Sequence, residues 1–407
     1  MNEEEKIITA LDLGSSKTTV LVAQLDSTGN IDLIGVGVAP SGGIKAGGVT
    51  NIESTVKSIK TAIEEAEIMS GIEITSVVTN VTGKHVHGDN AVGVIAVTNK
   101  DRLITQADIF RVIEAAQSIR IPADQEILHV LSKFFRVDDQ GGIKDPTGMV
   151  GVRLEADVHI ITGSTTYMLN MDKAIHESGL AVSDRILSAL ASSYSVLSEG
   201  EKELGVAVVD IGAGIMDIII YVDGGVAYSS TIGIGSQHMT QDISIGLKTP
   251  MDAAEILKKR YGTVMSALVD KDESIEVPSV GDRSPRITSR KHLAEIMEAR
   301  MRELLELIDN EIIRSGQKNR LAGGVIFTGG GALVDGMTTL AEEVINLGAA
   351  IGHPKGFSGI VEKISSPIFS TATGLILYAA QYTDFKTSQK KGKGFMDRMK
   401  HWIQDNL

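Results

Sequence analysis

The segment Val206–Tyr221, VAVVDIGAGIMDIIIY, is the most informative part of this chain about its fold. A β-branched apolar run enters a turn of small residues, and a second apolar run leaves it, which predicts two strands joined by a tight turn. The turn residues are Gly212, Ala213 and Gly214. Because glycine backbone can approach an anion closely and present its N–H groups, the turn is suited to phosphate. Asp210, at the end of the first strand, is placed to hold a metal ion through water.

The same region permits one other interpretation. Leu204–Val222 is long and mostly apolar, which is also typical of a transmembrane helix. Asp210, Asp217 and the glycines oppose this interpretation, because each acidic side chain at the centre of an inserted helix costs roughly 2.5–3.5 kcal/mol. We therefore expect strands here.

The pattern occurs a second time near the N-terminus. Ile7–Gln24 reads IITALDLGSSKTTVLVAQ, in which Asp12 and Gly14 correspond to Asp210 and Gly212. One Asp-x-Gly hairpin is a weak signal, because such turns are common between strands. Two of them, separated by half the chain, predict a duplicated architecture with two facing phosphate-binding hairpins. The first turn also contains Ser15, Ser16 and Lys17.

A third glycine-rich strand end lies at Gly323–Gly336, GGVIFTGGGALVDG. An apolar strand runs into three glycines and then into an expected helix, Met337–Leu347. The N-terminus of a helix and free loop N–H groups suit an anion or a nucleoside. A strand–helix turn without a ligand is the simpler interpretation of three glycines alone, but a third such loop in one chain favours the ligand. Its residues are Gly329, Gly330, Gly331 and Ala332.

Composition limits the classes of function. The 407 residues are 43% hydrophobic, enough for two to four folded units. A net charge of −13 argues against a general nucleic-acid binder, so no nucleic-acid partner is expected. The absence of cysteine excludes disulfides and thiolate metal sites and suits a reducing cytosol. The acidic start, MNEEEK, does not have the pattern of a signal peptide.

The character of the sequence changes between His85 and Ile161. This segment holds short β-like runs, one expected helix around Thr105–Ser118 and polar turns, which predicts a small α+β module inserted into the first half. Its histidines raise the question of a metal site, but their spacing matches none, and ordinary surface or packing roles are expected. They are His85, His87, His129 and His159.

The last residues predict an amphipathic helix, Phe395–Leu407, after a polar, lysine-rich linker at 384–394. At 100° per residue, six apolar side chains fall within an arc of about 140°. A helix docked on its own domain would need no lysine-rich spacer, so a membrane-surface helix fits better. One copy would bind marginally and several copies on a polymer firmly, which suggests self-association. The six are Phe395, Met396, Met399, Trp402, Ile403 and Leu407.

Taken together, DLGSSKTT, VVDIGAGIMD and FTGGGALVDG resemble the two phosphate motifs and the adenosine motif of the actin, Hsp70 and sugar-kinase superfamily. Within it, DDQGGIKDPTGMVGVRLEADVHIITG, ALASSYSVLSEGEKELGVAVVDIGAG and the terminal helix resemble the bacterial FtsA family, actin-like membrane tethers of the cell-division protein FtsZ. The resemblance covers nearly the whole chain. It implies an α/β fold of the duplicated ribonuclease-H-like type, with two lobes, a nucleotide cleft between them and an inserted α+β subdomain.

The resemblance also implies a division into subdomains. Residues 1–84 and 162–203 would form subdomain 1A, and residues 85–161 the inserted subdomain 1C. Residues 204–234 and 316–383 would form subdomain 2A, and residues 235–315 subdomain 2B. Residues 384–394 would be a flexible basic linker and residues 395–407 a membrane-targeting helix.

ATP with Mg²⁺ is the cofactor that the resemblance implies, bound between the lobes, with Asp12 and Asp210 near the metal through water. The expected phosphate contacts are Gly14, Ser15, Ser16 and Lys17 on one side and Gly212, Ala213 and Gly214 on the other. Glu255 and Lys258, in DAAEILKKRYG, match the helix that contacts the nucleoside, and Gly329, Gly330, Gly331 and Ala332 match the adenosine loop.

The implied partners are the C-terminal peptide of FtsZ on 2B, further copies of the chain in filaments, later division proteins on 1C, and the cytoplasmic face of the cell membrane at the division site. For the FtsZ peptide, the candidates for its carboxylates are Arg290, Lys291 and Arg300, and the candidate apolar contacts are Met297, Met301 and Leu304. A solvated helix face is an equally weighted interpretation of these cations, since surface ion pairs contribute little.

One departure from the superfamily concerns catalysis. Many members carry Glu, Gln or Asp on the helix before the second phosphate hairpin, to orient the attacking water. The helix expected here, Ile186–Ser198, has none. Without a positioned water, in-line attack loses much of its proximity advantage. We therefore expect ATP to act as a structural and polymerisation switch, in at most a weak ATPase, and we assign no catalytic residue.

Other functions share these nucleotide motifs. A PilM-like pilus-assembly protein is the nearest alternative, since it too is expected to be actin-like and peptide-binding at the membrane. A sugar or acyl-phosphate kinase would need a catalytic Asp base and would have no use for the terminal helix. An Hsp70-like chaperone would need a peptide-binding domain after the triple-glycine unit, where only about 70 residues remain.

Overall fold

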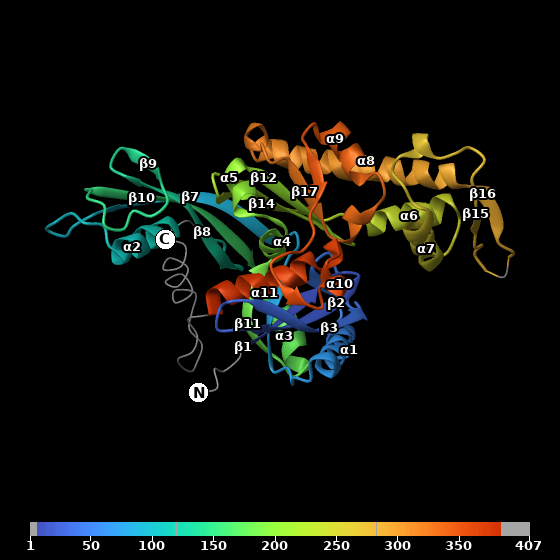
Figure 1. The fold of residues 1–407 in the computed structure, drawn as a ribbon, viewed down its shortest axis with the longest axis horizontal. Helices are drawn as coiled ribbons and strands as arrows, with labels where there is room; N and C mark the ends of the chain where they lie inside the picture. The colour runs from blue at the N-terminus through green and yellow to red at the C-terminus, as the bar shows by residue number, and fades with distance from the viewer. Residues whose placement is uncertain (1–5, 119–120, 282, 384–407) are drawn as a thin grey trace.

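A computed structural model of the chain describes residues 6–118, 121–281 and 283–383. The expected linker at 384–394 and membrane helix at 395–407 lie outside the described residues and stay predictions. In Figure 1 two sheets occupy the centre, one above the other. The inserted module lies at one end of the molecule, and helices α6 (Gln237–Gly246) and α7 (Met251–Tyr261) lie at the other.

The first sheet has the order β11-β6-β1-β2-β3-β19. An antiparallel meander of three strands forms one side of it, and two strands in parallel with β1 continue the other side. The meander is β1 (Lys6–Leu13), β2 (Lys17–Leu25) and β3 (Ile31–Pro40), and the parallel strands are β6 (Ser76–Val81) and β11 (Ala181–Leu187). A two-residue hairpin, β4 (Ile44–Lys45) and β5 (Gly48–Val49), follows the meander.

The second sheet repeats this arrangement with the order β14-β13-β12-β17-β18. Again a meander of three antiparallel strands is continued by two parallel ones. The meander is β12 (Val206–Ile211), β13 (Met216–Val222) and β14 (Gly225–Ile232), and the parallel strands are β17 (Val325–Thr328) and β18 (Ala349–Ile351). The duplicated α/β fold predicted from the two Asp-x-Gly hairpins is confirmed.

The second hairpin is apolar on both faces because each face packs in a different core. Val206 and Val208 belong to the cluster that includes the first sheet, whereas Ala207 and Val209 belong to the cluster beneath the long helix α8 (Arg290–Arg314). A strand buried on both sides reads as a continuous apolar run. Within the described residues no helix is long and apolar enough to cross a membrane, and residues 204–222 are mainly two strands.

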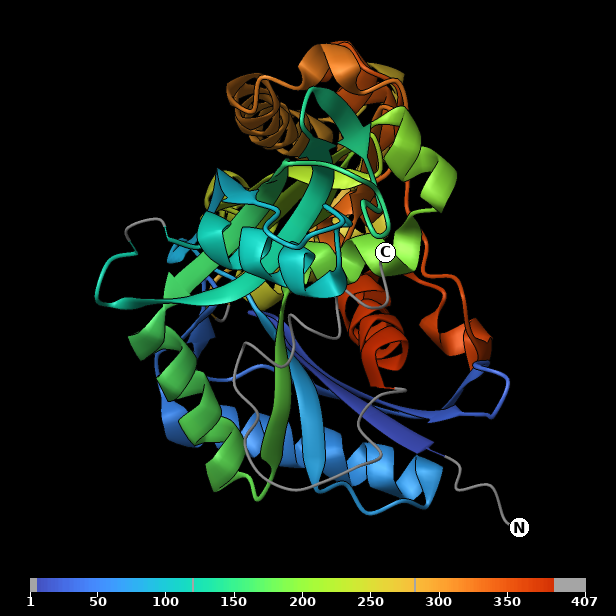
Figure 2. The same cartoon turned by 90° about the vertical axis from the view of Figure 1, so that its left-hand side faces the viewer.

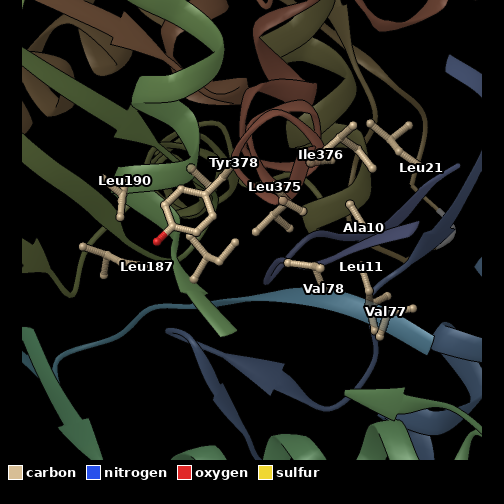
Figure 3. Close-up of a cluster of buried hydrophobic side chains, with 14 of the residues drawn as sticks. Ala10, Leu11, Leu21, Val77, Val78, Leu187, Leu190, Leu375, Ile376 and Tyr378 are labelled. Atoms are coloured by element: carbon tan, nitrogen blue, oxygen red, sulfur yellow. The ribbon is translucent and has the colours of Figure 1, made fainter. Parts of the chain in front are cut away.

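Helices cover both faces of the first sheet. Helices α1 (Ile52–Ser70) and α3 (Thr165–Glu177) lie on one side, and α4 (Ser188–Val196) and α11 (Ser370–Thr383) lie on the other (Figure 2). Figure 3 shows Leu375 of α11 and Leu190 of α4 gathered with side chains of β1, β2 and β6. Because α4 also contacts β12 and β13, it lies between the two sheets. The short helix α5 (Glu199–Leu204) then leads into β12.

The last described segment belongs with the first sheet. Strand β19 (Ser358–Gly359) pairs with β3, and α11 packs on β1 and β2. The expected assignment of 316–383 to the second lobe is therefore wrong from Ser358 onward, because the chain returns to the first lobe to cover its sheet. Helix α9 (Met337–Ile345) precedes this return and packs on α8. The short helix α10 (Val361–Ile364) belongs to the returning segment.

The inserted module has a sheet and a core of its own. Its strand order is β7 (Val86–Ala96), β10 (Arg153–Ser164), β8 (Gln125–Val137) and β9 (Gln140–Ile143). Helix α2 (Gln106–Ala116) covers one face. Thr105 caps this helix in a capping box with Asp108.

At the opposite end, α6 and α7 pack beside the hairpin β15 (Ser274–Val277) and β16 (Arg286–Ser289), and α8 follows. Ser289 caps α8, accepting from the Lys291 N–H at 3.2 Å. Most of the apolar stripe of α8 is buried. Three residues expected to contact a peptide fill the core instead, so that prediction is wrong for them. They are Met297, Met301 and Leu304, each with 0% exposure.

The crossing of α4 and α11 depends on Gly374. A Cβ built there would lie 1.7 Å from the Ala191 carbonyl oxygen, so backbone meets backbone. Gly374→Ala should push the two helices apart and lower the free energy of unfolding by about 1–3 kcal/mol. Urea unfolding measures this, with Gly200→Ala as the matched control, because a Cβ at Gly200 meets nothing within 4 Å. Equal stability of the two variants would contradict the close crossing.

Candidate nucleotide-binding site

The two hairpins have the same geometry. The Gly14 N–H donates to the Lys17 carbonyl at 3.1 Å, and the Gly212 N–H donates to the Ile215 carbonyl at 3.0 Å. In the strand register Asp12 lies opposite Thr19, as Asp210 lies opposite Asp217. The two aspartates thus occupy equivalent places in the repeat.

The fold brings the two turns into contact. A Cβ on Gly214 would lie 2.8 Å from Ser15 Oγ and 3.4 Å from the Ala46 nitrogen, so only glycine fits between them without displacement. The second turn is also held from behind, since the carbonyls of Gly212 and Ala213 accept N–H groups at the start of α6, each at 2.9 Å.

Buried charges gather at this contact. Asp12 and Asp210 are both buried. Burial raises the pKa of Asp12 to about 6; the positive charge of Lys17 opposes the rise, and the negative charge of Asp210 adds to it. Burial likewise raises the pKa of Asp210 and lowers the pKa of Lys17, whose ammonium both aspartates help to keep charged. These mutual effects agree with the contact between the two turns at Gly214 and Ser15.

Two hydroxyls from different helices hold Asp210 in place. Ser192 of α4 donates to Asp210 Oδ2 at 2.7 Å, and Thr371 of α11 donates to the same oxygen at 3.0 Å. Gly329 packs on the other oxygen: its Cβ would lie 2.2 Å from Oδ1, and its φ of +81° also favours glycine. The triple-glycine loop predicted from sequence therefore starts directly beside the second hairpin.

Asp217 is a third carboxylate of this site, and the sequence reasoning did not assign it a role. It accepts from Thr82 at 2.7 Å and from Thr231 at 2.6 Å. Burial raises its pKa to about 7, the two hydroxyls oppose the rise, and the charges of Asp210 and Asp12 add to it. An acidic residue inside an otherwise apolar strand, opposite Asp210, was the available signal.

Lys17 is the cation of the first hairpin. Its Nζ donates to Thr19 Oγ1 at 3.0 Å and lies 4.4 Å from the centre of the Phe369 ring. One ammonium is fewer than the carboxylates near it, so the site is suited to a further cation. The described residues contain no group of three His, Cys, Asp or Glu side chains able to hold a metal directly. This fits a Mg²⁺ that keeps waters and phosphate oxygens as ligands.

The expected nucleoside contacts form a group of their own. Lys258 lies 2.7 Å from Glu255, and Thr240 of α6 donates to Glu255 and accepts from Lys258 at 2.8 Å. Within the described part of the chain, Glu255 and Lys258 form their hydrogen bonds and ion pairs with residues of α6 and α7, and not with the hairpin turns. Their role toward a nucleoside stays a prediction.

Two of the three candidate peptide-binding cations have partners within the chain. Arg290 donates to the Tyr261 carbonyl at 2.8 Å and to Glu273 at 3.0 Å. Arg300 pairs with Asp242 and Glu303. A peptide carboxylate would have to displace these acidic groups, whereas Lys291 is half-buried and has no ion pair among the described contacts.

Three of the four histidines of the inserted module have packing roles, and the fourth, His87, is exposed. His129 accepts the Leu187 N–H at 3.0 Å, and His85 stacks on Tyr167 with ring centres 4.3 Å apart. His159 is fully buried and hydrogen-bonds Asn90 and Ser229.

Asp217 should make stability depend on pH. Because its pKa is raised to about 7 in the folded chain, the folded state binds this proton more tightly than the unfolded state. The free energy of unfolding should therefore fall as pH rises from about 4 to about 7, by roughly 2 kcal/mol between about pH 5.5 and about pH 8. Asp217→Asn should remove this loss, so the free energy of unfolding of the variant should increase relative to that of the wild type as pH rises.

Urea unfolding of the nucleotide-free protein at the two pH values measures the effect. Asp223→Asn is the control, since Asp223 is an exposed turn residue paired with Arg320. A difference between wild type and Asp217→Asn that does not change with pH would refute the assignment.

Solved structures with this fold resemble the chain. The PilM–PilN type IV pilus biogenesis complex matches with a TM-score of 0.64 and 15% identity, covering 92% of this chain and 98% of that one. MreB 5 of Spiroplasma citri bound to AMPPNP matches with a TM-score of 0.54 and 13% identity, covering 93% and 97%. At these identities the likeness shows the fold alone, which is that of actin-like proteins.

Sequence relatives are more specific. A family model described as "Cell division protein FtsA" matches residues 207–374, and one described as "SHS2 domain inserted in FTSA" matches residues 83–162. The cell division protein FtsA of Pseudomonas aeruginosa is 41% identical over 99% of this chain and 98% of its own length. That of Neisseria meningitidis is 40% identical over the full length of both, and that of Escherichia coli K12 is 39% identical over 93% and 91%. The chain therefore belongs to the FtsA family of cell division proteins.

Proposed function

We propose that this chain is an ATP-binding, actin-like protein that polymerises on the inner face of the cytoplasmic membrane. There it tethers FtsZ filaments during division and recruits later division proteins through the inserted module. The observation that carries the nucleotide part is the meeting of Asp12, Lys17 and Asp210 at two touching glycine turns. The rest is supported by family membership and by the terminal sequence.

MgATP fits the side chains of this site. The phosphates would lie at the two turns, with Lys17 as a counter-charge, and Asp12 and Asp210 would hold waters of the metal. Mg²⁺ would add positive charge to a site in which one lysine, Lys17, faces three buried carboxylates. The triple-glycine loop, whose Gly329 packs against Asp210 and whose Gly330 is exposed, would contact the nucleoside.

Removing one metal-facing carboxylate should abolish this binding. Asp12→Asn keeps the shape of the side chain and loses its charge, so MgATP affinity should fall more than tenfold, while binding without Mg²⁺ should change little. Isothermal titration of the purified chain with ATP in Mg²⁺ or EDTA measures this, with Asp223→Asn as the control. MgATP affinity unchanged in Asp12→Asn would argue against the site.

Slow turnover is part of the proposal. Helix α4 presents Ser192 to Asp210 and carries no Glu, Gln or Asp to orient a water. We expect phosphate release to stay below a few molecules per minute, an order-of-magnitude bound that follows from the missing proximity term. Turnover of many per minute, lost in Asp210→Ala, would contradict the switch role.

Binding of the FtsZ peptide should depend on Lys291, the candidate cation that has no ion pair among the described contacts. Lys291→Ala removes a charge available to the peptide's carboxylates, so affinity should fall about two- to fivefold, as one exposed ion pair predicts. Fluorescence anisotropy with a labelled FtsZ tail peptide measures it. Lys173→Ala, on α3, is the control. Failure of the wild-type chain to bind the peptide would favour a PilM-like role instead.

Membrane attachment should reside in the terminal helix. Full-length protein should float with anionic liposomes, and a chain ending at Thr383 should remain at the bottom of the gradient, because the six apolar side chains of 395–407 are lost. Replacing Trp402 by Glu in the full chain should have nearly the same effect. Equal flotation of the truncated chain would refute membrane attachment through residues 395–407.

A further inference from the structure

Residues 82–90 cross from the first lobe into the inserted module and lie along strand β14 of the second lobe. Thr82 donates to Asp217, which also accepts from Thr231 of β14. Lys84 packs over Gly233, where a Cβ would lie 1.8 Å from its Cε. We call this contact, residues 82–90 against residues 227–233, the β14 seam. Figure 1 shows β14 beside β7 and β8.

The seam continues into the module. Gly88 approaches Ser229 so closely that a Cβ would lie 2.3 Å from its Oγ. Asn90 donates to the Ala227 carbonyl at 3.0 Å. As the residue number rises from 84 to 90, its partner on the other side falls from 233 to 227, so the two segments run in opposite directions.

A buried histidine holds the far end of the seam. His159 of β10 bonds Asn90 at 2.9 Å through Nδ1 and Ser229 at 2.8 Å through Nε2. Lys133 of β8 donates to the same Asn90 oxygen at 3.1 Å. Burial lowers the pKa of His159 to about 3, so the ring is neutral under ordinary conditions and serves as a hydrogen-bonding junction. Side chains from three strands of the module therefore meet β14.

The near end of the seam touches the candidate nucleotide site. Asp217, the acceptor of Thr82, responds to the charges of Asp210 and Asp12. The chain connects the module to the first lobe, through β6 and α3, whereas the seam connects it to the second lobe. Any change in the angle between the lobes must therefore strain or move the seam.

We propose that the β14 seam couples the nucleotide site to the docking of the inserted module on the second lobe. This rests on the proposed binding of nucleotide at the hairpins. Nucleotide that holds the lobes together tightens the seam, and by thermodynamic reciprocity a loosened seam weakens nucleotide binding. A ligand of the module that moves it off β14 would act on the nucleotide site in the same way.

The test changes the far end of the seam, outside the nucleotide site. Ser229→Ala removes the partner of His159 Nε2. The fraction of chains with closed lobes should fall, and the dissociation constant for MgATP should rise three- to tenfold. Thr61→Ala, an exposed residue of α1, is the matched control, and isothermal titration is the measurement.

Hydrogen exchange supplies a second measurement, on the wild-type chain and on Ser229→Ala. MgATP should slow exchange in 86–96 and 225–232, and Ser229→Ala should lessen this protection. MgATP binding with unchanged exchange there, together with unchanged affinity in Ser229→Ala, would overturn the coupling alone. No MgATP binding by the wild-type chain would overturn the proposed function and the coupling with it.

Discussion

The buried carboxylate of Asp210 is the constraint on which the centre of the molecule depends. A buried charge is costly unless it is hydrogen-bonded or paired. Here hydroxyls of Ser192 and Thr371 donate to one oxygen, and they come from helices nearly 180 residues apart in sequence. Both hydroxyls reach Asp210 because α4 and α11 cross with backbone contact at Gly374. The other oxygen leaves no room for a side chain at position 329.

This arrangement explains why the fold is made of two similar halves. Each sheet ends a strand with an aspartate at a glycine turn, and neither half offers both sides of a phosphate site alone. Contact between the turns, at Gly214 and Ser15, creates a site with three carboxylates and one lysine. Such a site favours a bound cation and depends on the relative position of the lobes, which suits a switch better than a rapid catalyst.

The inserted module contacts both lobes, so it contributes to how the lobes are placed relative to each other. Its strands begin and end at the first lobe, but its buried His159 and the neighbouring Asn90 bond residues of β14 in the second. Buried polar groups of this kind require specific partners. The position of the module is thereby specified by both lobes, and it is the part of the molecule best placed to respond when they move.

The local elements of this fold follow from short patterns in the amino-acid sequence. The Asp-x-Gly turns, the cap at Ser289 and the cap at Thr105 follow from backbone preferences of a few adjacent residues, and all are present. The duplication could be predicted because the same local pattern occurs twice.

Which elements pack against one another depends on contacts between residues far apart in the sequence. Residues 181–187 form a parallel strand, β11, although a helix was expected to start at Ile186. The strand forms because it pairs with β6, about 100 residues earlier in the chain. The tertiary structure also placed α11 on the first sheet and Met301 in the core rather than at the surface. Asp217 likewise acquires its role from Thr82, 135 residues distant. A pattern of hydrophobic residues shows that a face will be buried, but the partner that buries it is chosen by long-range packing.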